Sequence, residues 1–202
     1  MSAIVNLPEV TRKRMLILQN LLQGWQSEKI TSVQISEITG WKDSLIRHDF
    51  WLLGYNKGIS NGYLKDDLQE AINLALGFES EQKNCCIVGL NRLGAALLDD
   101  ATTEGSVFKI KAGFDSNVNR VEILRSTFPL YPATEMSWVI KKENIRLAIL
   151  TVAAKDAQSM CDRLVKAGIS GIVNMTNSVL RVPENVKLEN LSILNSLKII
   201  SG

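Results

Sequence analysis

The chain has 202 residues, of which 46% are hydrophobic and 22% charged, and its formal net charge is +2. These values are ordinary for a soluble globular protein of one large or two modest domains. The net charge is too small to indicate by itself that the protein binds nucleic acid. No apolar run approaches the roughly 20 residues that span a membrane, and residues 1–8 lack the pattern of a signal peptide. We therefore expect a cytoplasmic protein without a membrane span.

The three cysteines do not form the even, spaced set of a disulfide framework. Cys85 and Cys86 are adjacent within an apolar run, and Cys161 stands alone. We expect free thiols that pack as small hydrophobic groups in a reducing compartment. Adjacent residues of a strand point to opposite faces, so Cys85 and Cys86 are not expected to share a metal ion.

The first third of the chain has apolar residues at helical spacing. Helices are predicted over residues 8–22, 33–39, 42–53 and 63–76, with a turn-rich stretch over 54–62 that could form a wing. A brief strand near Ile30 is predicted to lead to a helix cap at Thr31 or Ser32. Ile35 and Ile38 are three positions apart and are expected to lie on one face of the second helix.

Two short helices separated by Thr39 and Gly40 match a helix-turn-helix, whose second helix enters the major groove of DNA. Arg47 can read guanine or hold a phosphate, and Asp49 is a polar residue on the otherwise apolar face of that helix. The candidate DNA-contacting residues of the helix and the wing are Lys42, Ser44, Arg47, His48 and Lys57. The alternative is a helical dimerisation module whose polar outer face is only solvated.

The rest of the chain alternates short apolar runs with helical patterns. Strands are predicted over residues 85–88, 108–114, 129–131, 147–152, 171–174 and 186–189, and helices over 95–98, 137–142 and 156–167. Several runs are apolar on both faces, which indicates a parallel sheet covered on both sides. The predicted fold class is therefore α/β, with a winged-helix domain (1–77), a Rossmann-type domain (78–187) and a C-terminal helix (188–202).

The segment from Gly89 to Gly94 follows a buried strand and opens a helix, and Asp115 closes the next strand about 20 positions later. That layout is typical of a dinucleotide-binding turn: the first glycine permits the tight turn, the last permits close helix–strand packing, and the acid can accept hydrogen bonds from a ribose. The N–H groups at the helix start can bind a pyrophosphate. Asn91 replaces the middle glycine of the pattern, so the alternative is a strand–turn–helix corner without a ligand.

No catalytic residues are predicted. His48 is the only histidine and lies in the helical part, so neither a Ser/His/Asp nor a Cys/His set can be built, and no group of metal ligands is present. A small oxidoreductase would need an acid–base residue near the nicotinamide. Lys155 and Asp156 are better explained as a solvated helix start, which disfavours an enzyme.

Taken together, these motifs resemble the Rex family of redox-sensing transcriptional repressors, from Leu7 to about Leu197. The matching pieces are Arg47-His48-Asp49 with Gly54, Gly62-Tyr63, Val88 to Gly94 with Ala96-Leu97, Gly113-Phe114-Asp115, Val152-Ala153-Ala154 with Ala157-Gln158, Ala167-Gly168, Gly171-Ile172 and Asn174. The resemblance implies a homodimer that binds an operator in double-stranded DNA and senses the NADH/NAD+ ratio, with NADH favouring release. The cofactor contacts that it implies are Gly89, Leu90, Asn91, Arg92, Leu93, Gly94, Asp115, Ser116, Val152, Ala153, Ala154 and Asn174.

The chain also departs from the family pattern. Asn91 replaces a glycine, residues 58–60 (Gly-Ile-Ser) stand where the wing usually has Lys-Arg-Gly, and Asn117 replaces a second acid after Asp115. Ser192 falls where an aspartate usually pairs with an arginine of the first helix, here Arg14. The alternative function is therefore a divergent dimer that binds another nucleotide or none and acts as an interaction module. The C-terminal helix either exchanges between subunits or packs on its own chain.

Overall fold

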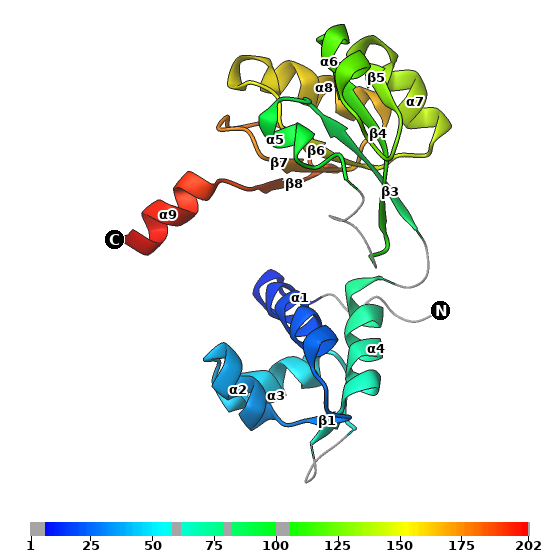
Figure 1. Ribbon diagram of the computed structural model, residues 1–202. Coiled ribbons are helices and arrows are strands. Elements are labelled where there is room, and N and C mark those ends of the chain that lie inside the picture. The colour runs from blue at the N-terminus through cyan, green and yellow to red at the C-terminus, as the bar shows by residue number, and fades with distance from the viewer. Residues whose placement is uncertain (1–6, 58–61, 79–81, 100–105, 202) are drawn as a thin grey trace. The chain divides into compact units, whose positions relative to one another are not determined.

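The computed structural model describes residues 7–57, 62–78, 82–99 and 106–201. The chain forms two compact units, residues 1–80 and 81–202, which we describe separately (Figure 1). Among the described residues, no helix combines the length and the apolar character needed to cross a membrane. The same residues contain no cluster of His, Cys, Asp and Glu that could hold a metal ion.

The first unit is a helical bundle with a two-stranded ribbon. Its elements are α1 (Glu9–Gly24), β1 (Lys29–Ile30), α2 (Ser32–Thr39), α3 (Asp43–Leu52), β2 (Tyr63–Leu64) and α4 (Lys65–Leu76). Thr31 begins α2 with a capping box, because its hydroxyl accepts from the Gln34 N–H while the Gln34 side chain accepts from the Thr31 N–H. Gly40, at φ +72°, ends α2 in the left-handed conformation. The helix-turn-helix and its predicted cap are confirmed.

Most of the core of this unit follows the predicted periodicity. The largest fully buried side chains are Met15, Leu18, Leu22, Ile30, Ile35, Ile46, Phe50, Leu68 and Ile72. Ile38 was expected to share the face of Ile35 but is 57% exposed, because only one side of the two-turn helix α2 meets the core. Residues 63–64 pair with β1 as an antiparallel strand, so the helix predicted from residue 63 begins at Lys65.

The second unit contains a six-stranded parallel sheet in the order β5-β4-β3-β6-β7-β8. Its strands are β3 (Lys83–Val88), β4 (Phe108–Asp115), β5 (Leu130–Pro132), β6 (Leu147–Leu150), β7 (Gly171–Asn174) and β8 (Lys187–Asn190). Its helices are α5 (Arg92–Ala95), α6 (Val118–Ile123), α7 (Met136–Lys142), α8 (Ala157–Ala167) and α9 (Ile193–Ser201), with 3-10 turns at Ala133–Glu135 and Ala154–Asp156.

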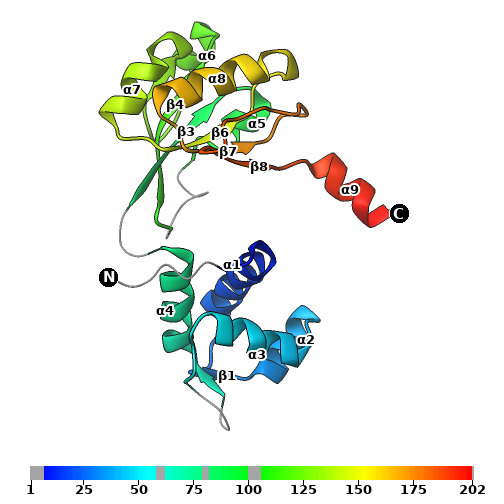
Figure 2. The same ribbon diagram turned by 180° about the vertical axis from the view of Figure 1, so that it is seen from behind.

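Helices cover this sheet on both faces, as predicted. Figures 1 and 2 show α7 and α8 on one face and α5 on the other. The core between the sheet and α7 and α8 includes Phe114, Met136 and Leu164, and the opposite core includes Ile87 and Leu90. The sequence did not predict α6, which buries no residue and so leaves no apolar pattern. The helix predicted over residues 95–98 lies three residues earlier, because α5 covers Arg92–Ala95 and begins within the predicted turn.

The three cysteines are free and buried, as expected. Burial raises the pKa of the Cys85 thiol to about 11 and also raises the pKa of Cys86 and Cys161. Since the thiolate is the reactive form, we expect slow reaction of all three thiols with a disulfide reagent at pH 8 in the folded protein, and fast reaction after unfolding. Rapid modification of any thiol in the folded protein would contradict this.

The same pKa shifts predict how stability depends on pH. The unfolded chain loses thiol protons near the ordinary cysteine pKa of 9, whereas folded Cys85 keeps its proton to about pH 11. The folded state therefore binds more protons over this range, and the free energy of unfolding should decrease as the pH rises from 9 to 11. Urea unfolding at a series of pH values measures this, and a free energy that stays constant or increases over the range would contradict it.

Candidate nucleotide-binding crevice and DNA-binding surface

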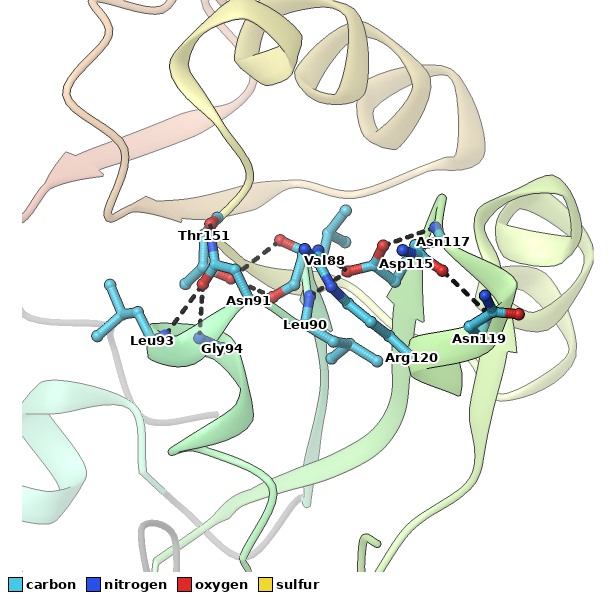
Figure 3. A network of polar contacts seen from close by, with 11 residues as sticks. Val88, Leu90, Asn91, Leu93, Gly94, Asp115, Asn117, Asn119, Arg120 and Thr151 are labelled. Carbon is cyan, nitrogen blue, oxygen red and sulfur yellow. Dashed lines mark hydrogen bonds and ion pairs between the residues drawn. The ribbon is translucent and has the colours of Figure 1, made fainter. Parts of the chain in front are cut away.

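The carboxyl ends of β3 and β6 form the point where the strand order reverses. From β3 the chain proceeds to β4 on one side, and β6 pairs with the other side of β3. In open parallel sheets of this kind, ligands bind in the crevice beyond the carboxyl ends of the strands at such a reversal. The predicted nucleotide turn, residues 89–94, lies at this point (Figure 3).

Both glycines of the turn have the steric roles that the sequence predicts. Gly89 has φ +100°, and a Cβ on it would lie 2.7 Å from the Val152 nitrogen. A Cβ on Gly94 would lie 1.8 Å from the Gly89 carbonyl oxygen. The first glycine therefore permits the turn, and the second lets the start of α5 lie directly against the end of β3.

The oxygen and the nitrogen of the Asn91 side-chain amide both form hydrogen bonds. Its Oδ1 accepts hydrogen bonds from the N–H groups of Leu93, at 3.0 Å, and Gly94, at 3.1 Å, and so caps α5. Its Nδ2 donates to the carbonyl oxygen of Thr151, immediately after β6 (Figure 3). Asn91 has φ −68°, which any residue can adopt, so its left-handed tolerance is not used.

Asp115 is buried at the end of β4 and contacts the same turn. Its Oδ2 accepts from the Leu90 N–H at 2.7 Å, and its Oδ1 accepts from the Asn117 N–H at 2.7 Å. Arg120 of α6 places Nη1 3.3 Å from Asp115 Oδ2, so the carboxylate is partly neutralised (Figure 3). The carboxylate is 5% exposed and lines a cavity, where it can still accept hydrogen bonds from a hydroxyl group.

This cavity, of about 150 Å³, lies over the ends of β3, β4 and β6. Its lining residues are Val88, Gly89, Asn91, Phe114, Asp115, Ser116, Arg120, Ala133, Val152, Ala153, Asp156 and Met160. Six of the predicted cofactor residues are among them: Gly89, Asn91, Asp115, Ser116, Val152 and Ala153. The structure thus brings together residues from three parts of the sequence.

The other predicted cofactor residues lie elsewhere. Leu90 packs in the core, and Arg92, Leu93, Gly94 and Ala154 are not part of the cavity lining. Asn174 is 1% exposed, and its side chain forms hydrogen bonds with Thr176, Ser178 and Asn190. Sequence reasoning missed Arg120, and it interpreted Asp156 as part of a solvated helix start, whereas Asp156 lines the cavity. An arginine five positions after the strand-ending acid was the available signal for Arg120.

The candidate DNA-binding residues lie on α3 or near its ends in the sequence. Lys42, Ser44, Arg47 and His48 are all exposed, as is Lys57 beyond the helix. Arg47 pairs with Asp43 one turn earlier, and Lys57 lies 3.6 Å from Asp67. Trp51, which is not among the candidates, is also 66% exposed and stacks on His48 with ring centroids 5.8 Å apart. Residues 58–60, where the basic wing sequence is missing, lie outside the described residues.

A buried ion pair fixes the opposite side of α3. Asp49 is fully buried, and Arg14 of α1 donates to both of its oxygens, from Nε at 2.6 Å and from Nη2 at 2.7 Å. The Thr11 hydroxyl donates to Asp49 Oδ1 at 3.1 Å. The hydrogen bonds to Asp49 raise the pKa of Arg14. The polar residue on the apolar face is thereby explained, and Arg14 has an acidic partner within its own unit.

A helix-turn-helix unit followed by a Rossmann-type sheet joins a fold typical of DNA binding to a fold typical of nucleotide binding. A family model described as a CoA binding domain matches residues 80–178. The redox-sensing transcriptional repressor Rex of Limosilactobacillus fermentum is 30% identical, over 95% of this chain and 90% of the relative. That of Ligilactobacillus salivarius is 31% identical, over 97% and 93%.

Solved structures that resemble nearly the whole chain belong to the same family as these relatives. The chain superposes on the Rex-family repressor RSP with a TM-score of 0.84 at 28% identity, over 97% of this chain and 93% of that one. The similarity to RSP in complex with NAD+ and operator DNA has a TM-score of 0.88 at 28% identity, over 96% and 91%. A further RSP structure contains NADH, with a TM-score of 0.84. The chain belongs to the Rex family of redox-sensing transcriptional repressors.

Proposed function

We propose that the protein is a DNA-binding transcriptional repressor that senses the NADH/NAD+ ratio, with NADH favouring release from its operator. The observation that carries the proposal is the presence, in one chain, of exposed Lys42, Arg47 and His48 at the second helix of a helix-turn-helix and a crevice with Asp115 at the reversal of the strand order. The solved relative RSP, which is similar over nearly the whole chain, was crystallised with both nucleotides and with operator DNA.

The proposal assigns a role to each part of the chain. Residues 1–77 bind the operator, residues 78–187 bind the nucleotide, and residues 188–202 contribute to a homodimer. α9 supports this last role, because none of its residues is buried and Leu194, Leu197 and Ile200 are exposed. An apolar helix that buries nothing within its own unit fits a partner subunit better than it fits solvent. The protein acts in the cytoplasm and is not an enzyme.

In DNA binding, Arg47 is expected to contribute most among the exposed residues of α3. Its guanidinium pairs with Asp43 in the free protein and can exchange that exposed carboxylate for a base edge or a phosphate. Arg47→Ala should weaken operator binding about tenfold, which is the loss of one good contact. Gel shifts at fixed salt, on a palindromic duplex selected from a random pool, measure this effect.

Arg181→Ala is the matched control, because Arg181 is an exposed arginine of the second unit. It should leave operator affinity unchanged. Equal operator affinities for the wild type and Arg47→Ala would show that α3 is not the recognition helix. If the wild type shows no sequence-selective binding with either nucleotide or without one, the proposed function is wrong, and an interaction module becomes the better hypothesis.

A further inference from the structure

Asn91 stands where a dinucleotide-binding turn has a glycine that lets the backbone approach a pyrophosphate. Its side chain uses two backbone donors, because Oδ1 accepts from the N–H groups of Leu93 and Gly94 at 3.0 and 3.1 Å. Backbone N–H groups of such a turn are the donors that phosphate oxygens need. The amide oxygen of Asn91 therefore stands in for a phosphate oxygen.

The other end of the amide is also fixed. Asn91 Nδ2 donates to the carbonyl oxygen of Thr151, a residue that is 2% exposed. Thr151 Oγ1 donates in turn to the Gly89 carbonyl oxygen at 2.5 Å, so the turn after β3 and the end of β6 are joined through these residues (Figure 3). Asn91 also lines the cavity beside Asp115. The side chain thus has a defined position within the candidate binding crevice.

We propose that Asn91 is a specificity-determining residue whose side chain occupies the phosphate position and has to be displaced before a pyrophosphate can bind. This inference rests on the proposed nucleotide-binding function. A charged phosphate oxygen is a stronger acceptor than a neutral amide oxygen, so displacement is feasible. Displacement breaks the hydrogen bonds of the Asn91 side chain to Leu93, Gly94 and Thr151. Each nucleotide therefore binds more weakly than it would to a turn with glycine at position 91.

The competition applies only to the phosphate-bearing part of a ligand. Adenosine has no phosphate and does not need the two N–H groups, whereas ADP and NADH carry a pyrophosphate. The substituent at position 91 should therefore change the affinity for ADP and NADH and leave the affinity for adenosine unchanged. This selectivity separates displacement of Asn91 from a general effect on the stability of the turn.

The test is calorimetric titration of the full chain, as wild type, Asn91→Gly and Asn91→Asp, with adenosine, ADP and NADH. Asn91→Gly removes the competing oxygen and should bind ADP and NADH about tenfold tighter. Asn91→Asp keeps an acceptor for both N–H groups but adds a negative charge. It should bind ADP and NADH at least about tenfold more weakly than the wild type does. Adenosine affinity should stay the same in all three proteins, and thermal unfolding verifies that each is folded.

If the wild type binds ADP and NADH and neither variant changes those affinities, the inference is overturned while the proposed function stands. Parallel changes for adenosine and ADP would overturn it as well, since they would reflect the turn and not the phosphate. Absence of binding of every ligand to all three proteins would contradict both the inference and the nucleotide-sensing function. Asn91→Asp keeps the test decisive if loss of the cap unfolds Asn91→Gly, because aspartate is also a good helix cap.

Discussion

Replacing Asp49 with alanine is expected to destabilise the first unit by about 3–5 kcal/mol, because it leaves the guanidinium of Arg14 partly buried without its carboxylate. The side chain of Arg14 is only 16% exposed, so water cannot fully replace the two hydrogen bonds that are lost. A loss of this size is comparable with the whole stability of a small domain, which is about 5–15 kcal/mol. Operator binding should be lost with it, because α3 is fixed to α1 by this ion pair.

Urea unfolding followed by tryptophan fluorescence measures the effect, since Trp25 and Trp41 pack against the core of the first unit. The double variant Arg14→Met/Asp49→Leu removes both charges and should recover most of the stability. Glu9→Gln, at the exposed Glu9–Lys13 pair of α1, is the surface control and should not move the midpoint. A midpoint for Asp49→Ala equal to that of the wild type would show that the buried pair does not hold α3 in place.

Gly94→Ala is expected to destabilise the second unit by about 3 kcal/mol and to abolish nucleotide binding. The added Cβ would lie 1.8 Å from the Gly89 carbonyl oxygen and 2.8 Å from Thr151 Oγ1. The first of these is a backbone atom, so the clash can be relieved only by moving the turn itself. That movement would shift the N–H groups of Leu93 and Gly94, which are the donors that a phosphate needs at this turn.

Circular dichroism during urea unfolding and an NADH titration together measure this prediction. Gly24→Ala is the matched control, because a Cβ added there has no atom within 4 Å apart from its chain neighbours and the backbone of its own helix. It should change stability by less than about 1 kcal/mol and leave NADH binding as in the wild type. Wild-type NADH affinity in Gly94→Ala would mean that the turn after β3 is not part of the nucleotide site.

Local rules made much of the fold predictable from the sequence. The N-cap at Thr31 and the positive φ of Gly40 are short-range features, and both were visible as residue types. The long apolar runs of the strands identified the parallel sheet. By contrast, the exposure of Ile38 depends on which side of a two-turn helix meets the core, and this is decided by tertiary packing.

The sequence predicted where the candidate site lies, but it did not predict most of the contacts between its side chains. The spacing of Gly89, Gly94 and Asp115 located the crevice, since each residue type has one steric or chemical role there. Arg120 was missed because α6 buries nothing and its arginine meets Asp115 only in three dimensions. The partner of Asp49 lies 35 residues away on α1, beyond any local pattern. The sequence also showed that Asn91 replaces a glycine, but only the structure shows which donors its side chain takes.

The most direct measurement of the proposed function is the affinity of the wild-type protein for its operator as the NADH/NAD+ ratio is varied at constant total nucleotide. Fluorescence anisotropy of a labelled duplex at fixed salt provides it. The dissociation constant should rise as NADH replaces NAD+, because the nucleotide that favours release binds the DNA-free form more tightly. The same dissociation constant at every ratio would contradict redox sensing by this chain, even if the operator is bound selectively.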